Sequence, residues 1–247
     1  MPTPLIPALE LIKSSWQAFT KSWEALVRYS AWLILPAILA LADLAIPAGQ
    51  DFAIIASAVA QVTATIAVSI WVSVALYQVV FATEKGEKVS DRTTANAWQL
   101  VLPLLVIGLL QGLATMGALL LLILPGIYVG VRLGFSQLTL FSKNLRGRAA
   151  LADSWALTKN RFWAVLWRQI AGAFVFGILV MIVTIAAMLL VGIVAGGAKV
   201  GALLSTESSN PLATGILDLI QSIIQAAFIP LFIIYQVKLY KALEKTR

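Results

Sequence analysis

Six runs of predominantly apolar residues, between 15 and 34 residues long, constrain this chain more than any other feature. A helix needs roughly twenty apolar residues to cross the hydrocarbon core of a bilayer. Charged residues make up only 12% of the sequence, whereas a soluble domain has about a quarter. We therefore predict an all-α membrane protein that forms a single integral membrane domain over residues 1–247. Its six predicted transmembrane helices cover residues 29–46, 52–82, 101–123, 127–141, 162–195 and 213–237.

The third and fourth spans are separated only by Leu124-Pro125-Gly126. Without a break they would form one helix of roughly 60 Å, far longer than any bilayer requires. A tight hairpin at Pro125-Gly126 is therefore favoured. Because residues 127–141 are few for a full crossing, a re-entrant segment stays open as the alternative.

Residues 8–28 have the pattern of an amphipathic helix that precedes the first span. Its apolar positions recur every three or four residues, which places them on one stripe of a helix. Trp and Phe on this stripe, with Lys and Arg opposite, are typical of a helix lying in the membrane interface. A helix that packs on a soluble core is the alternative. The stripe consists of Leu9, Ile12, Trp16, Phe19, Trp23 and Leu26.

The distribution of Lys and Arg predicts the orientation of the chain. With both termini in the cytoplasm, sixteen of the 18 basic residues fall in cytoplasmic segments. Lys199 alone falls on the opposite side, and Arg132 lies within the fourth span. Basic residues are strongly enriched in cytoplasmic loops. We expect a multi-pass protein of the bacterial cytoplasmic (inner) membrane with cytoplasmic N- and C-termini.

The sequence also contains an internal similarity. Ser15-Trp16 and the residues after it resemble Ser154-Trp155 and its successors, and Tyr77-Gln78-Val79 resembles Tyr235-Gln236-Val237. With a weaker counterpart before the third span, these segments predict three repeats of an interfacial helix plus a transmembrane hairpin. Chance similarity between Trp- and Lys-bearing interface segments is the alternative.

Arg132 and Asp218 are charged residues inside predicted spans. Such residues normally find a partner or water, because an isolated charge in the bilayer is costly. Both lie at matching depths from the same side, so we predict a buried Arg132–Asp218 ion pair. The pair would serve either to lock the fold or to bind an anion or lipid headgroup.

Polar residues share one face of the sixth span with Asp218. Gln221, Ser222 and Gln225 follow it at spacings of three and four. This face could line a polar pathway, although small polar residues commonly hydrogen-bond to neighbouring helices instead.

Glycines repeat every four residues in the third and fourth spans and predict close packing of the two helices as an antiparallel pair. They are Gly108 and Gly112 in the third span, and Gly126, Gly130 and Gly134 in the fourth.

The segment 142–168 is basic and rich in Trp, and we expect it on the cytoplasmic side. Clusters of four to eight basic residues next to spans attract anionic lipid headgroups. The ordinary positive-inside bias would also produce much of this cluster. The candidate lipid contacts are Lys143, Arg146, Arg148, Lys159, Arg161 and Arg168.

The chain contains neither cysteine nor histidine. Thiolate nucleophiles, the usual zinc sites and His-based acid–base chemistry are therefore excluded. The remaining polar residues form no recognisable catalytic motif, so we expect no enzymatic activity, no catalytic residues, no metal and no cofactor. Nucleic acid is not an expected partner, because no nucleic-acid-binding fold carries the basic residues.

The stretch from Leu121-Leu122-Ile123-Leu124-Pro125-Gly126 to Arg132, together with Ala149 to Trp163, resembles the membrane-domain family of glycerophosphoryl diester phosphodiesterases. It is also similar to uncharacterised bacterial inner-membrane proteins of the YciC-like kind. The resemblance covers about residues 120–168 and implies a helical membrane module. It carries no phosphodiesterase activity here, because the chain lacks the histidines and the carboxylate cluster of that chemistry.

Two functions follow from these expectations. The first is a non-enzymatic membrane module that scaffolds a membrane-protein partner or organises lipid around its interfacial helices. The alternative is a transporter or channel for a small or anionic solute that uses Arg132 and Asp218.

Overall fold

The computed structural model describes residues 5–41, 50–87, 89, 94–194 and 211–246, and these are helical without a strand. Among these residues, six helical segments are long and apolar enough to cross a membrane, by length and composition, when Ala8–Ala40 and Ile123–Lys143 are each taken as one segment, which agrees with the predicted multi-pass membrane protein. The end of the predicted span 29–46 and the polar position Lys199 lie outside the described residues. In chain order the helices are α1 (Ala8–Ser30), η1 (Ala31–Ile34), α2 (Leu35–Ala40), α3 (Asp51–Glu84), α5 (Ala97–Leu121), α6 (Ile123–Leu133), α7 (Ser136–Lys143), α8 (Gly147–Leu157), α9 (Phe162–Val194) and α11 (Pro211–Lys245).

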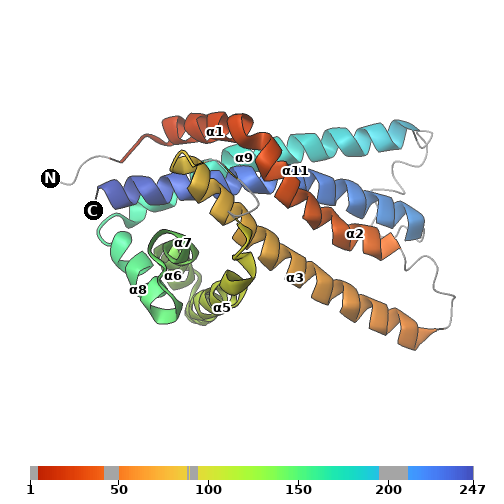
Figure 1. The fold of residues 1–247 in the computed structure, drawn as a ribbon, viewed down its shortest axis with the longest axis horizontal. Coiled ribbons are helices and arrows are strands. Elements are labelled where there is room, and N and C mark those ends of the chain that lie inside the picture. Colours follow the sequence, from red (N-terminus) through yellow and green to blue (C-terminus); the bar gives the residue numbers. More distant parts are fainter. Residues whose placement is uncertain (1–4, 42–49, 88, 90–93, 195–210, 247) are drawn as a thin grey trace.

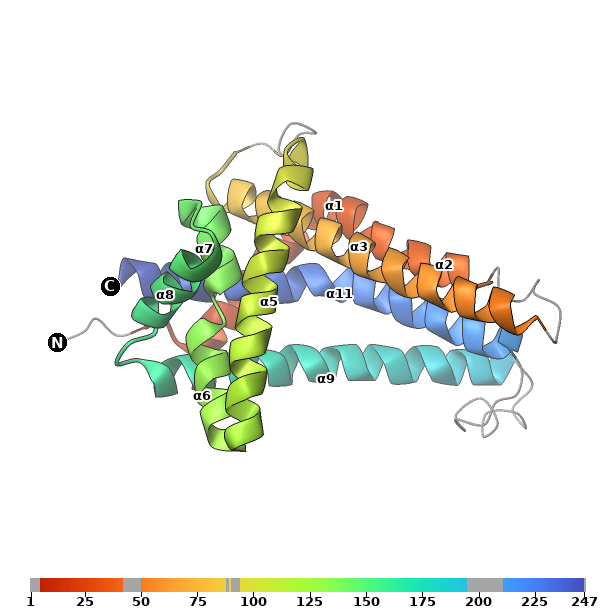
Figure 2. The same ribbon diagram turned by 90° about the horizontal axis from the view of Figure 1, so that it is seen from below.

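The long helices α3, α9 and α11 run side by side with α2, and α1 packs across α11 (Figures 1 and 2). The beginning of α1 and the end of α11 lie at the same end of this bundle, which we call the terminal end (Figure 1). Tyr235, Tyr240 and Leu76 belong to the core and are almost completely buried. The first half of α3, by contrast, exposes apolar side chains such as Ile55 and Val59. Apolar residues facing outward over whole helix turns are suited to contact with lipid tails.

The predicted amphipathic helix corresponds to α1, but it continues beyond Arg28. It runs to Ser30 with a kink at Ser22, and the 3₁₀ turn η1 leads directly into α2. The protein-facing positions include Leu11, Ser15 and Leu26. Three members of the predicted apolar stripe are instead exposed: Leu9, Trp16 and Trp23. They are available to a membrane surface, while the interfacial position of α1 stays a prediction.

Helices α5 and α6 form a hairpin, as predicted, but its turn is earlier than expected. The turn is Leu122, which has extended backbone angles between the end of α5 and the start of α6. Pro125 lies within the first turn of α6, where a missing N–H is tolerated because no intrahelical acceptor awaits it. The turn therefore precedes the proline, and the expected hairpin at Pro125-Gly126 was placed too late.

Close packing of α5 on α6 is confirmed. A Cβ atom on Gly126 would lie 2.3 Å from Cγ of Leu119 and 3.0 Å from its Cα, so only glycine permits this approach. Gly130 faces Thr115 at ordinary contact distance, whereas Gly112 has open space around it. The hairpin lies crosswise to α3, α9 and α11 rather than alongside them (Figure 2).

The fourth predicted span is not one continuous helix. It consists of α6 and α7, separated by a turn at Gly134 and Phe135. The predicted bounds 127–141 thus cross a helix break that apolar composition alone does not indicate. The predicted spans 52–82, 101–123 and 162–195 agree with α3, α5 and α9 to within a few residues, and α11 continues beyond the predicted end to Lys245. The predicted span 29–46 instead begins at the end of α1 and continues through η1 and α2, and its residues 42–46 lie outside the described residues. The three-repeat arrangement stays a prediction.

Candidate functional site

Arg132 lies near the end of α6 and is 5% exposed. Its guanidinium carbon lies 4.5 Å from the ring centre of Trp155 in α8 and 5.6 Å from that of Tyr128, one turn earlier in α6. The two rings meet edge to face. Cation–π contacts of this kind contribute about 0.5–2 kcal/mol each, more when water is excluded. Arg132 is therefore held by two aromatic rings.

The predicted Arg132–Asp218 ion pair is wrong. Among the described residues, no salt bridge includes either side chain, and Asp218 is exposed on α11. Depth along the sequence suggested the pair under the assumption that α6 runs beside α11. The crosswise α5–α6 hairpin instead places α6 near the terminal end, away from the first turns of α11 (Figure 2).

This correction makes a prediction about stability. Asp218→Asn is expected to change the free energy of unfolding by less than about 0.5 kcal/mol, because an exposed side chain without a charged partner is replaced. Arg132→Gln is expected to destabilise by about 1–2 kcal/mol through loss of the two ring contacts. Unfolding in detergent, followed by tryptophan fluorescence, measures both. If both variants lost the same free energy of unfolding, the result would support an Arg132–Asp218 ion pair and contradict the contacts described here.

The break between α6 and α7 is bridged by Ser154 of α8. Its Oγ donates to the carbonyl oxygen of Arg132 at 2.8 Å and accepts from the backbone N–H of Phe135 at 3.2 Å. Thr158 Oγ1 donates to the same carbonyl at 3.4 Å. Both hydroxyl-bearing residues are completely buried. The Ser154-Trp155 motif thus satisfies backbone groups that a helix break leaves unpaired, and Trp155 holds Arg132 beside it.

The polar residues predicted to share one face of the sixth span are exposed or half-buried. Asp218 and Gln225 are exposed, and Gln221 and Ser222 are half-buried. All four lie on α11, and none is joined to Arg132 by a hydrogen bond or ion pair.

Three of the six predicted lipid contacts are engaged within the protein. Lys143 forms salt bridges with Asp153 at 2.8 Å and Glu244 at 3.4 Å. Arg161 donates to the hydroxyl and the carbonyl oxygen of Thr246. Arg168 donates to the carbonyl oxygens of Leu5, Ile6 and Ala164. These side chains fasten the terminal segments to α7 and α9.

The other three, Arg146, Arg148 and Lys159, are exposed and form no ion pair with any described residue. They lie on α8 or directly beside it. Trp163 and Trp167, at the beginning of α9, are 77% and 66% exposed. We call these five residues the α8 surface. Exposed Trp and exposed basic side chains in adjoining segments are the composition of a membrane–water interface.

Sequence reasoning missed an ion cluster at the terminal end. Glu84, the last residue of α3, accepts Lys238 at 3.3 Å and Lys241 at 3.5 Å from α11. Lys238 and Lys241 lie one helical turn apart on α11, and this spacing could have indicated that they share an acidic partner. The cluster joins the adjacent ends of α3 and α11.

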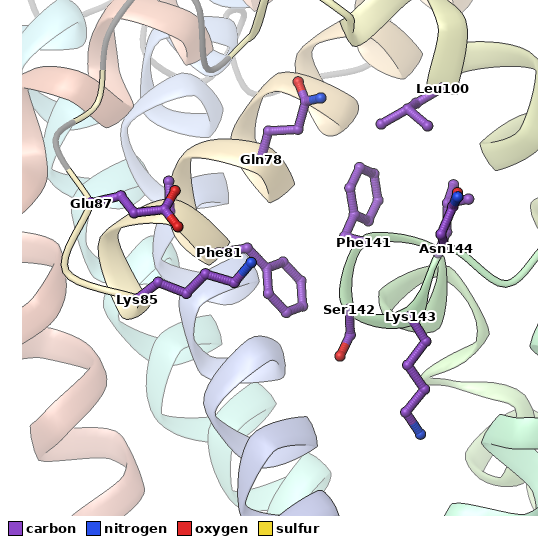
Figure 3. Close-up of a pocket in the computed structure, with 11 residues that line it drawn as sticks. Gln78, Phe81, Lys85, Glu87, Leu100, Phe141, Ser142, Lys143 and Asn144 are labelled. Carbon is purple, nitrogen blue, oxygen red and sulfur yellow. The ribbon is translucent and has the colours of Figure 1, made fainter.

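Sequence reasoning also missed an open pocket of about 540 Å³ between α3, α5 and α7 (Figure 3). Phe81 and Phe141 contribute nearly parallel rings whose centres are 6.3 Å apart. Lys85 and Glu87 reach it from the end of α3, and Gln78 lies deeper, toward Leu100 (Figure 3). The pocket therefore combines aromatic walls with two lysines, one carboxylate, two amides and one hydroxyl, contributed by Lys85, Lys143, Glu87, Gln78, Asn144 and Ser142.

No group of three or more Asp or Glu residues able to hold a metal ion occurs in the part of the chain that the structure describes. Searches against protein-family models, curated proteins and solved structures find no match to this chain. The resemblance of residues 120–168 to a membrane-domain family thus stays a prediction, and the function must be argued from the surfaces themselves.

Proposed function

We propose that this chain is a non-enzymatic module of the bacterial cytoplasmic membrane, with both termini in the cytoplasm, that binds anionic lipid headgroups at the α8 surface. The observation that carries the proposal is the exposure of three basic side chains on α8 and its flanks, Arg146, Arg148 and Lys159, together with the exposed rings of Trp163 and Trp167 at the beginning of the following helix. In this role the protein organises lipid around its interfacial helices.

The charge of the surface supports a lipid rather than a solute. Juxtamembrane basic residues each contribute about 1 kcal/mol to binding an anionic leaflet. Exposed indole rings prefer the headgroup level of the bilayer, where their apolar body and N–H are both accommodated. An anionic lipid headgroup at the bilayer surface can contact both kinds of side chain.

The absence of His and Cys from the sequence supports a non-enzymatic role. The alternative of a transporter is less well supported, because Arg132 and Asp218 form no ion pair with each other. The polar residues of α11 are exposed or half-buried. A role as a scaffold for a membrane-protein partner stays a prediction. Mass spectrometry of proteins that copurify with the chain would test it.

The test is native mass spectrometry of the delipidated full chain with added phosphatidylglycerol or phosphatidylcholine. The triple variant Arg146→Gln, Arg148→Gln, Lys159→Gln is expected to lose at least about tenfold in affinity for phosphatidylglycerol. Binding of phosphatidylcholine should change little, because it offers no net negative charge.

The matched control is Lys13→Gln, Lys21→Gln, Lys245→Gln, which removes the same charge from exposed positions on α1 and α11. If this control loses as much phosphatidylglycerol affinity as the α8 variant, net charge explains binding and the α8 surface is not a site. Equal binding of the two lipids by the wild-type chain would also contradict the proposal.

A further inference from the structure

The pocket between α3, α5 and α7 has the size of a binding site. Its volume of about 540 Å³ lies within the range of roughly 300–1,000 Å³ found for small-molecule pockets. Its apolar wall includes Phe81, Leu100 and Phe141, and it is open to the outside of the protein. These walls suit a ligand with a carbon portion as well as polar groups.

Three polar side chains of the pocket are not used by the protein itself. Lys85 and Glu87 are exposed and form no salt bridge with each other or with any other described residue. The Gln78 Oε1 atom is buried and accepts no hydrogen bond. A buried amide oxygen without a donor carries a desolvation penalty of about 1–3 kcal/mol. A ligand that supplies a donor would remove this penalty.

Lys143 also borders the pocket but does not add to its free charge. Its ammonium is held by Asp153 and Glu244 and points away from Gln78 and Lys85 (Figure 3). Among the described residues that line the pocket, the charged groups outside any salt bridge are thus the ammonium of Lys85 and the carboxylate of Glu87.

This set of groups selects the chemistry of the ligand. Glu87 and Gln78 are two free acceptors, which suit an ammonium that carries N–H donors. Lys85 is a free cation, and lysine commonly binds phosphate as a point charge. A simple anion would leave Glu87 opposed by like charge, and a quaternary ammonium has no N–H to donate to Gln78.

We propose that this pocket binds a phosphoethanolamine group, either as the headgroup of a phospholipid or as the free compound. The ammonium of the ligand lies at Glu87 and Gln78, its phosphate lies at Lys85, and its carbon atoms contact Phe81, Phe141 and Leu100. The pocket is separate from the α8 surface, so the inference does not rest on the proposed lipid-binding function of that surface.

Native mass spectrometry of the full chain with phosphatidylethanolamine, phosphatidylcholine and phosphatidylglycerol tests the proposal. The wild-type chain should bind phosphatidylethanolamine about fivefold more tightly than phosphatidylcholine. Glu87→Gln should lower phosphatidylethanolamine affinity by about fivefold, which is the effect of losing one partly exposed ion pair. Phosphatidylglycerol binding should be unchanged in this variant. Lys85→Gln should also weaken phosphatidylethanolamine binding.

Glu24→Gln and Lys13→Gln are the matched controls, since both residues are exposed on α1. Neither should change phosphatidylethanolamine affinity. The α8 triple variant should lose phosphatidylglycerol but keep phosphatidylethanolamine, so failure of one proposal is distinguishable from failure of the other. Because every substituted side chain is exposed, unchanged thermal unfolding is expected.

Addition of soluble phosphoethanolamine identifies the source of the ligand. If millimolar phosphoethanolamine displaces the lipid, the free compound occupies the pocket. If it does not displace the lipid, the acyl-bearing form is required. Equal binding of phosphatidylethanolamine and phosphatidylcholine by the wild-type chain would overturn the proposal. Wild-type phosphatidylethanolamine affinity in Glu87→Gln would overturn it as well.

Discussion

Gly172→Ala is expected to lower the free energy of unfolding by about 1–3 kcal/mol through overpacking. A Cβ at this position of α9 would lie 2.4 Å from Cε1 and 2.5 Å from Cζ of Tyr235 in α11. The ring has no room to withdraw, because Tyr235 is 2% exposed and its hydroxyl donates to the carbonyl oxygen of Arg168 at 2.5 Å. The methyl group must therefore push α9 away from α11. Unfolding in detergent, followed by tryptophan fluorescence, measures the loss.

Gly177→Ala provides the control on the same helix. A Cβ there meets no atom within 4 Å, so this change should leave stability unchanged or raise it by up to about 1 kcal/mol, as expected for Gly→Ala within a helix. If Gly172→Ala and Gly177→Ala gave the same stability, α9 and α11 would not be in the close contact described.

Ser154→Ala is expected to destabilise the protein by roughly 2–3 kcal/mol. The substitution removes the hydroxyl that bridges the backbone of α6 and α7, leaving the N–H of Phe135 buried without an acceptor. Each buried unsatisfied group costs about 1–3 kcal/mol. The carbonyl of Arg132 retains its longer hydrogen bond from Thr158, which limits the loss. Chemical unfolding in detergent gives the free-energy difference directly.

Ser14→Ala is the matched control, since the Ser14 hydroxyl donates only to the carbonyl oxygen of Leu11 within the same helix. The Leu11 carbonyl also takes part in the backbone hydrogen bonds of α1, so the free energy of unfolding should change by less than about 0.5 kcal/mol. A Ser154 variant as stable as the Ser14 variant would mean that water or a rearranged backbone replaces the bridging hydroxyl.

The helices were predictable because their apolar runs are long and are bounded by polar or glycine- and proline-containing segments. α3 and α9 match the predicted spans 52–82 and 162–195 within one or two residues. The break at Gly134 and Phe135 was not predictable from hydropathy, since glycine in an apolar run reads equally as a helix-packing position. Its signal was the buried hydroxyl of Ser154, which lies far along the chain.

The partners of Arg132 were only partly predictable. Tyr128 lies four residues earlier on the same helix face, so a ring contact was accessible from spacing alone. Trp155 reaches it through tertiary packing of α8, which no local pattern encodes. The choice of Asp218 failed because matching depth implies proximity only for helices that run alongside each other.

The pocket shows the same limit. Gln78 and Phe141 belong to segments about sixty residues apart in sequence, and neither carries a motif. Lys143 is neutralised because tertiary packing brings it to Asp153 of α8 and Glu244 of α11. Lys85 has no such partner among the described residues and stays free. Charge counting along the chain treats these two lysines alike.

The crosswise α5–α6 hairpin also determines the outline of the molecule. It leaves the bundle sideways near the terminal end, so in the view of Figure 2 the protein is broader there than at the opposite end of α3, α9 and α11. Leucine side chains around the hairpin turn are exposed: Leu120 is 86% exposed and Leu124 is 78% exposed. If α3, α9 and α11 cross a bilayer, we expect a body of this profile to displace a larger area from the leaflet at the terminal end than from the other leaflet.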